Sequence, residues 1–137
     1  MKRKIKEIID QLGVNIEEHT GLDADGHYIA MINTIVLDAQ LAGLKRTLVL
    51  LHELGHACLH HNNHELYNLT ASMHYKMETE ADLFMINRIM ERRFNDSDFD
   101  PDSFNYINFL ESYELNPNYE SVVKEMVKSY YIRTKIV

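Results

Sequence analysis

Two histidines and a glutamate with the spacing H-E-x-x-H are the residues of this chain best suited to chemistry. Residues 52–56 read His-Glu-Leu-Gly-His. Side chains four positions apart lie on one face of a helix, so the imidazoles of His52 and His56 can reach one metal ion from the same side. The carboxylate of Glu53 can then act as general base toward a water in the metal's open position. The pattern predicts a metal-dependent hydrolytic site with Zn²⁺ as its ion.

A third protein ligand is needed, because a catalytic zinc ion usually has three protein ligands plus water. One arrangement places a third histidine six residues after the second, but that position is Asn62 here. Another takes a carboxylate from a later helix, where Glu78 and Glu80 both offer one. Glu78 is preferred because its helix face is mostly apolar and should point inward, and Glu80 is the alternative. Two histidines and one carboxylate can also hold Mn²⁺.

Other polar residues near the motif have more than one reading. Asp82 is placed either to accept the ring N–H of a ligand histidine or to lie on the surface. His60, His61 and His64 follow the motif and suggest either a larger histidine–metal cluster or ordinary roles at a helix end and in a loop. The oxyanion formed during peptide hydrolysis needs a donor besides the metal. His74, Tyr75 and the other tyrosines are candidates.

The motif requires a helix, and the surrounding leucines provide one. They recur every three or four residues, which predicts a helix over about residues 41–60 with Asp38 as N-cap. Gly55 costs this helix about 1 kcal/mol relative to alanine. Close approach of another backbone, a substrate strand or a packed helix would explain it. A second helix, carrying the carboxylates, is expected over about residues 74–93.

Short elements precede the motif helix. Residues 2–12 fit an amphipathic helix that ends at Gly13, and residues 14–18 fit a strand. Residues 28–32 and 35–37 fit a hairpin that turns at Asn33 and Thr34. The edge of such a sheet can pair with an extended substrate backbone, or the sheet can simply cover the core.

The expected fold class is α+β and zincin-like, with a small antiparallel three-stranded sheet packed on a helical bundle that contains the motif helix. Residues 1–137 fit one domain by length. Within it, residues 1–95 are expected to form the catalytic core and residues 96–137 a C-terminal helical part. A short helix is expected near residues 104–110 and a final helix near residues 122–130.

Composition excludes several classes of protein. The net charge of −7 argues against direct nucleic-acid binding, and no apolar run is long enough for a membrane span. The basic start of the chain is not followed by a sustained apolar segment, so no signal peptide is expected. The single cysteine, Cys58, cannot form an intrachain disulfide and is expected to be a small packed side chain. These features favour a cytoplasmic location.

The two motifs together resemble those of the ImmA/IrrE metallopeptidases. These proteins carry a helical H-E-L-G-H and a downstream E-x-x-A-[ND]-x-F-A, and residues 78–84 here read Glu-Thr-Glu-Ala-Asp-Leu-Phe. The resemblance covers roughly residues 25–90. Met85 stands where the family often has alanine. The resemblance implies His52, His56 and Glu78 as metal ligands and Glu53 as base.

The resemblance also implies a biological role. It is that of an intracellular protease linked to phages or mobile elements, which cleaves or inactivates a helix-turn-helix repressor and so releases transcription. Two rival hypotheses remain. One is a non-catalytic metal-containing module that sequesters the repressor, and the other is a histidine-rich metal buffer. The sequence leaves the oligomeric state open.

Overall fold

The computed structural model describes residues 4–63, 67 and 69–136, so His64 lies outside the described residues. The chain divides into two compact units, Met1–Arg88 and Ile89–Val137. The boundary falls inside the long helix α3 (Ala71–Phe94). Helices and a small sheet within the chain confirm the α+β class.

The sheet of the first unit has three strands: β1 (Asn15–His19), β2 (Gly26–Ile29) and β3 (Thr34–Asp38). β3 lies in the centre, pairs antiparallel with β2 and pairs parallel with β1. The prediction of a wholly antiparallel sheet was therefore wrong, and the sheet is mixed. β2 and β3 are neighbours in sequence, so their pairing is local. β1 pairs with the other edge of β3, which is distant in sequence, and no local sequence pattern predicts such a pairing.

The predicted hairpin is present with a different turn. A short 3-10 helix, η1 (Ala30–Ile32), follows β2, and Asn33 then takes a left-handed conformation with φ of 46°. Thr34 already belongs to β3. The two-residue Asn33–Thr34 turn was thus wrong, because threonine pairs in the strand more readily than it adopts a turn conformation.

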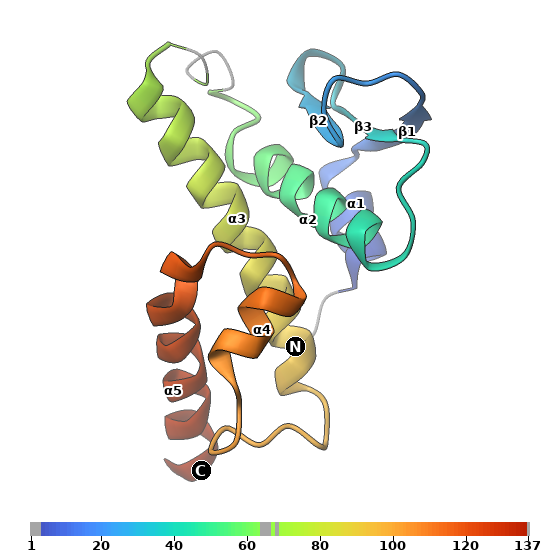
Figure 1. The fold of residues 1–137 in the computed structure, drawn as a ribbon. Helices are drawn as coiled ribbons and strands as arrows, with labels where there is room; N and C mark the ends of the chain where they lie inside the picture. The colour runs from blue at the N-terminus through green and yellow to red at the C-terminus, as the bar shows by residue number, and fades with distance from the viewer. Residues whose placement is uncertain (1–3, 64–66, 68, 137) are drawn as a thin grey trace. The chain divides into compact units, whose positions relative to one another are not determined.

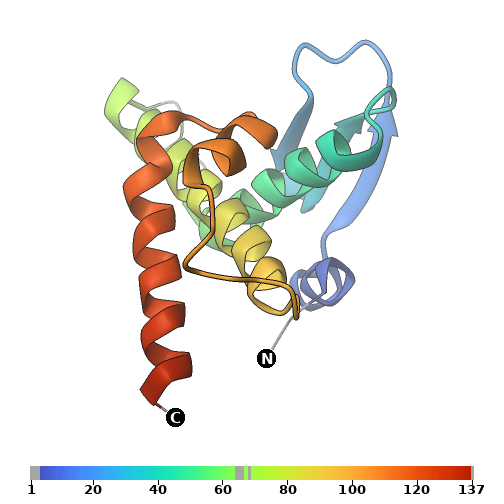
Figure 2. The same ribbon diagram turned by 60° about the horizontal axis from the view of Figure 1, so that its bottom comes forward.

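Three helices complete the framework around the site: α1 (Ile5–Leu12), α2 (Gly43–Leu59) and the first part of α3. α2 packs against β2, β3 and α1 (Figures 1 and 2). The core between them includes the fully buried Ile35, Leu37 and Leu54.

Two expectations about the motif helix were wrong. α2 starts after Ala42 rather than after Asp38. Asp38 remains in β3, where its N–H donates to the carbonyl of Asp25 at 2.8 Å, so its backbone is committed to the sheet. Cys58, expected to be packed, is exposed.

Gly55 lies at a close approach of α2 to α3. A Cβ at this position would lie 3.0 Å from the Cα of Ala81 and 3.1 Å from its carbonyl oxygen. Among the explanations for this glycine, close helix packing is the one that the structure supports. The close approach places the motif histidines of α2 beside the carboxylates of α3.

The second unit is helical, with α4 (Tyr106–Ser112), η3 (Pro117–Tyr119) and α5 (Glu120–Ile136). Aromatic rings pack inside it, and Phe94 stacks on Tyr130 with ring centroids 4.5 Å apart. Both C-terminal helices were predicted near their observed places, but α5, with 17 residues, extends beyond the predicted residues 122–130 at both ends. None of the described helices combines the length and apolar character required to cross a membrane.

Candidate metal centre

His52, His56 and Glu78 converge between α2 and α3. The Oε2 atom of Glu78 lies 2.7 Å from Nε2 of His52 and 3.1 Å from Nε2 of His56. One potential ligand atom from each of the three residues falls within 4.8 Å of the others. The structure therefore brings together the three residues that the sequence singled out as ligands.

The local fold explains this convergence. The four-residue spacing of the histidines places them on one face of α2, with ring centroids 4.9 Å apart. On α3, Ala81 and Met85 share the face of Glu78 and are buried, so Glu78 points inward as predicted. The side chain of Glu80 does not join the cluster and instead contacts His60.

Each of the three converging residues has a further polar partner. Asp82 places Oδ1 2.8 Å from Nδ1 of His52, and the ring of His60 lies 2.9 Å from Nδ1 of His56. The hydroxyl of Tyr67 donates to Oε1 of Glu78. The orientation of the cluster is therefore held by a surrounding hydrogen-bond network.

The three converging residues fit a divalent metal ion. Zinc bound tetrahedrally by nitrogen and oxygen at about 2.0–2.1 Å has ligand atoms about 3.4 Å apart. The observed separations of 2.7 and 3.1 Å are hydrogen-bond distances and are shorter than this value, so the side chains would move slightly apart around an ion. Two imidazoles and one carboxylate also leave a fourth position for water or substrate.

Electrostatics distinguish the two carboxylates of the site. Burial raises the pKa of Glu53, although the nearby histidines oppose the shift. Burial would also raise the pKa of Glu78, but hydrogen bonds from His52, His56 and Tyr67 outweigh it and hold that pKa far below its usual range. Glu78 is therefore the fixed anion, and Glu53 is the carboxylate better able to exchange a proton.

His52, which lies beside Glu53 and Glu78, carries a positive charge when no metal is bound. Burial lowers the pKa of His52, but hydrogen bonds with Asp82 and Glu78 outweigh it and raise the pKa to about 10. A cation bound at this point would replace that proton.

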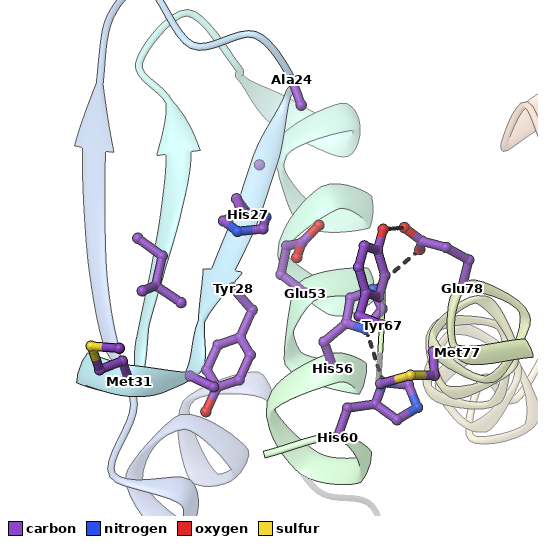
Figure 3. Close-up of a pocket in the computed structure, with 13 residues that line it drawn as sticks. Ala24, His27, Tyr28, Met31, Glu53, His56, His60, Tyr67, Met77 and Glu78 are labelled. Carbon is purple, nitrogen blue, oxygen red and sulfur yellow. Dashed lines mark hydrogen bonds and ion pairs between the residues drawn. The ribbon is translucent and has the colours of Figure 1, made fainter. Parts of the chain in front are cut away.

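A cavity of about 430 Å³ opens beside the cluster (Figure 3). β2 forms one wall, and residues of α2 and α3 form the other. Glu53, only 8% exposed, points into it from α2. Its described lining residues are Ala24, Gly26, His27, Tyr28, Ile29, Ala30, Met31, Glu53, His56, His60, Tyr67, Met77 and Glu78.

Comparison with known families is consistent with this geometry. The family model for Peptidase M78, described as the IrrE N-terminal-like domain, matches residues 9–127. The chain belongs to this family. Membership confirms the resemblance to the ImmA/IrrE proteins and indicates a metallopeptidase-type function acting on protein. No curated protein and no solved structure gave a match.

Within this IrrE-like domain, Tyr67 is the residue that sequence reasoning missed. Its hydroxyl contacts Glu78, and its ring packs edge-on against His56 with centroids 5.7 Å apart. Of the donors considered from sequence, Tyr75 is 73% exposed, and the ring of His74 packs against Tyr67. Tyr67 lies in a polar connection whose sequence has no helical or strand periodicity. Its residue type was therefore the only feature that made it a candidate donor.

Proposed function

We propose that this chain is a metal-dependent endopeptidase in which His52, His56 and Glu78 hold one divalent cation and Glu53 is the general base. The convergence of the three ligand atoms within 4.8 Å, beside a cavity, is the observation that carries the proposal. Zn²⁺ is the proposed ion because nitrogen and oxygen ligands in this number suit it, and Mn²⁺ is the alternative.

The metal, when bound, supplies Lewis acidity toward the scissile carbonyl and lowers the pKa of water toward about 7. Glu53 accepts the proton of the attacking water and delivers it to the leaving amine nitrogen. Burial favours this role because it raises the pKa of Glu53 and so stabilises the protonated carboxyl between the two transfers. Burial also keeps bulk water from competing for that proton.

Substrate alignment is assigned to β2. Within the described part of the chain, this strand pairs with β3 alone and borders the cavity. The N–H of Asp38 donates to the carbonyl of Asp25, so these two residues form a hydrogen-bonded pair of the antiparallel ladder. Hydrogen-bonded and non-hydrogen-bonded pairs alternate along such a ladder. The backbone N–H and C=O groups of Gly26 and Tyr28 therefore point away from β3, toward the outer edge of β2. An extended peptide can add to this edge through main-chain hydrogen bonds.

Gly26 keeps this wall close to the catalytic helix. A Cβ there would lie 2.7 Å from Cγ1 of Val49 and 3.4 Å from Cγ of Glu53. The absence of a side chain therefore lets β2 lie against α2, beside Glu53. A peptide on the outer edge of β2 would pass close to that carboxylate.

Tyr67 is the proposed donor to the oxyanion. Its hydroxyl already reaches the cluster through Glu78. Burial and the negative charge of Glu78 raise the pKa of Tyr67, so its hydroxyl stays protonated and able to donate. The hydroxyl has one hydrogen, so donation to the oxyanion requires it to turn from Oε1 of Glu78 toward the substrate.

The proposed substrate is a helix-turn-helix repressor of a phage or mobile element, cleaved in the cytoplasm. Membership of the IrrE N-terminal-like family and the paired motifs support this substrate class. The negative net charge fits a protein substrate rather than nucleic acid.

The direct experiment uses Glu53→Gln with purified helix-turn-helix repressors of phages or mobile elements as candidate substrates. We expect bound metal to remain and cleavage to fall about 10²–10⁴-fold, as for loss of a general base. Glu125→Gln, at an exposed position of α5, is the matched control and should cleave normally. Unchanged cleavage by Glu53→Gln would remove Glu53 from catalysis. Inactivation of the repressor without fragments, equally by wild type and Glu53→Gln, would establish sequestration in place of hydrolysis.

A further inference from the structure

His60 is a buried histidine that the proposed chemistry does not use. It lies one turn beyond His56 on the motif helix side of the cavity and is only 3% exposed. Its Nδ1 lies 2.9 Å from Nδ1 of His56, and its Nε2 lies 3.1 Å from Oε1 of Glu80. Figure 3 shows the contact between His60 and His56. Both ring nitrogens of His60 are therefore committed to partners.

The chemistry of these contacts fixes where the hydrogens lie. An ionised carboxylate can only accept a hydrogen bond, so Glu80 requires a hydrogen on Nε2 of His60. A neutral imidazole with that hydrogen has a lone pair on Nδ1. Two ring nitrogens 2.9 Å apart share a single hydrogen, which must then belong to Nδ1 of His56.

The position of this hydrogen on His56 affects the metal cluster. A neutral His56 with its hydrogen on Nδ1 presents a lone pair at Nε2, the atom that lies 3.1 Å from Oε2 of Glu78. Without a metal, this contact is the hydrogen bond that His56 donates to Glu78. A bound cation takes the place of that hydrogen, and Nε2 then offers its lone pair to the ion. The arrangement of His60 and Glu80 therefore prepares His56 for a metal ion.

His52 shows the simpler form of the same device. Its Nδ1 lies 2.8 Å from Oδ1 of Asp82, so a carboxylate contacts this histidine directly. For His56, the carboxylate of Glu80 acts through the intervening ring of His60. Histidines that bind metals commonly donate their second N–H to such a partner, which fixes tautomer and ring orientation.

We infer that His60 is a positioning residue which, anchored by Glu80, holds His56 in the tautomer that presents Nε2 to the metal. This inference rests on the proposed metal site. It also gives both residues a role other than the ligand roles considered from sequence.

The first test compares Zn²⁺ affinities, measured by competition with a chromophoric chelator. His60→Leu removes the acceptor for His56 and should weaken binding about 10–100-fold. His60→Gln keeps a carbonyl oxygen for His56 and an N–H for Glu80, so its affinity should stay close to wild type. Glu80→Leu should weaken binding less than His60→Leu, because His60 itself remains. His19→Leu, at an exposed histidine, is the control and should bind normally.

The second test reads the tautomer by ¹⁵N NMR of the zinc-loaded wild type. We expect the hydrogen of His60 on Nε2 and that of His56 on Nδ1. A hydrogen on Nδ1 of His60 would overturn the inference. So would equal losses of affinity in His60→Leu and His60→Gln, or no loss in either.

The failure of the metal site itself is distinguishable. His56→Ala should abolish stoichiometric Zn²⁺ binding if the proposed site is correct. Normal binding by His56→Ala would refute that site. Loss in His56→Ala together with normal binding by His60→Leu would refute only the positioning role.

Discussion

Glu53 and Glu78 lie in one site, but their surroundings act on them in opposite directions. Burial raises the pKa of Glu53, whereas three hydrogen-bond donors hold the pKa of Glu78 low. Carboxylates whose pKa values are driven apart in this way can divide their work, one binding a cation and the other moving a proton. This division is the residue-scale argument for a hydrolytic site.

The charge on His52 gives a pH-dependent prediction for the metal-free protein. Its pKa rises from 6.5 when unfolded to about 10 when folded. The stability that it contributes should be complete below pH 6.5 and should be lost as the pH rises toward 10. Urea unfolding with a chelator should therefore show a difference between wild type and His52→Gln that shrinks with rising pH. A difference that grows with pH would contradict the charged pair.

Tyr67 gives a kinetic prediction. Tyr67→Phe removes the hydroxyl but keeps the ring against His56, so kcat should fall about 10²-fold, the usual effect of losing one oxyanion donor. KM should change little, because the interaction belongs to the transition state. Tyr75→Phe, at an exposed position nearby, is the control. Equal kcat values for the two variants would exclude Tyr67 as donor.

At the scale of elements, the site depends on how closely α2 approaches α3 at Gly55. Gly55→Ala places a methyl group 3.0–3.1 Å from Ala81 and Phe84. The overpacking should cost about 1–3 kcal/mol, against about 1 kcal/mol gained in helix propensity.

We therefore expect a net loss of stability in urea unfolding and weaker Zn²⁺ binding, because the helices that carry the ligands are forced apart. Cys58→Ala, at an exposed position of the same helix, should alter neither. A more stable Gly55→Ala with normal metal affinity would show that the close approach does not position the site.

The elements also show what the sequence can and cannot predict. The spacing of the leucines predicted α2, and the apolar helix face that contains Glu78 favoured this residue over Glu80. Both predictions were possible because each pattern repeats within a single helix. The parallel pairing of β1 with β3 was missed because it joins Asn15 to Thr34, with the whole of β2 lying between them in sequence.

Partners outside the helical pattern were harder to predict. Tyr67 lies in a connection where no repeat indicates which side chain faces the site. The contact of His60 with Glu80 joins residues 20 positions apart and depends on how the two helices pack. The sequence therefore identified residues on regular faces but not the side chains that support them.

At the scale of the whole molecule, all three converging residues belong to the first compact unit, while the family match extends into the second. Metal binding should stabilise the fold, because the ligands join two helices that are separate in sequence. At a free metal concentration 100 times Kd, the gain is about 2.7 kcal/mol. The midpoint temperature of thermal unfolding should therefore rise when Zn²⁺ is added and fall back when a chelator removes it. His56→Ala should show no shift, and an equal shift in that variant would place the metal elsewhere.

The most direct test of the proposed metal site is a crystal structure of the zinc-loaded protein with anomalous scattering data at the zinc edge. We expect a single strong peak about 2.0–2.2 Å from Nε2 of His52, Nε2 of His56 and a carboxylate oxygen of Glu78. His60 and Glu80 should not contact the ion. The absence of a peak at this position, or a peak bound by His60, would refute a metal site formed by His52, His56 and Glu78.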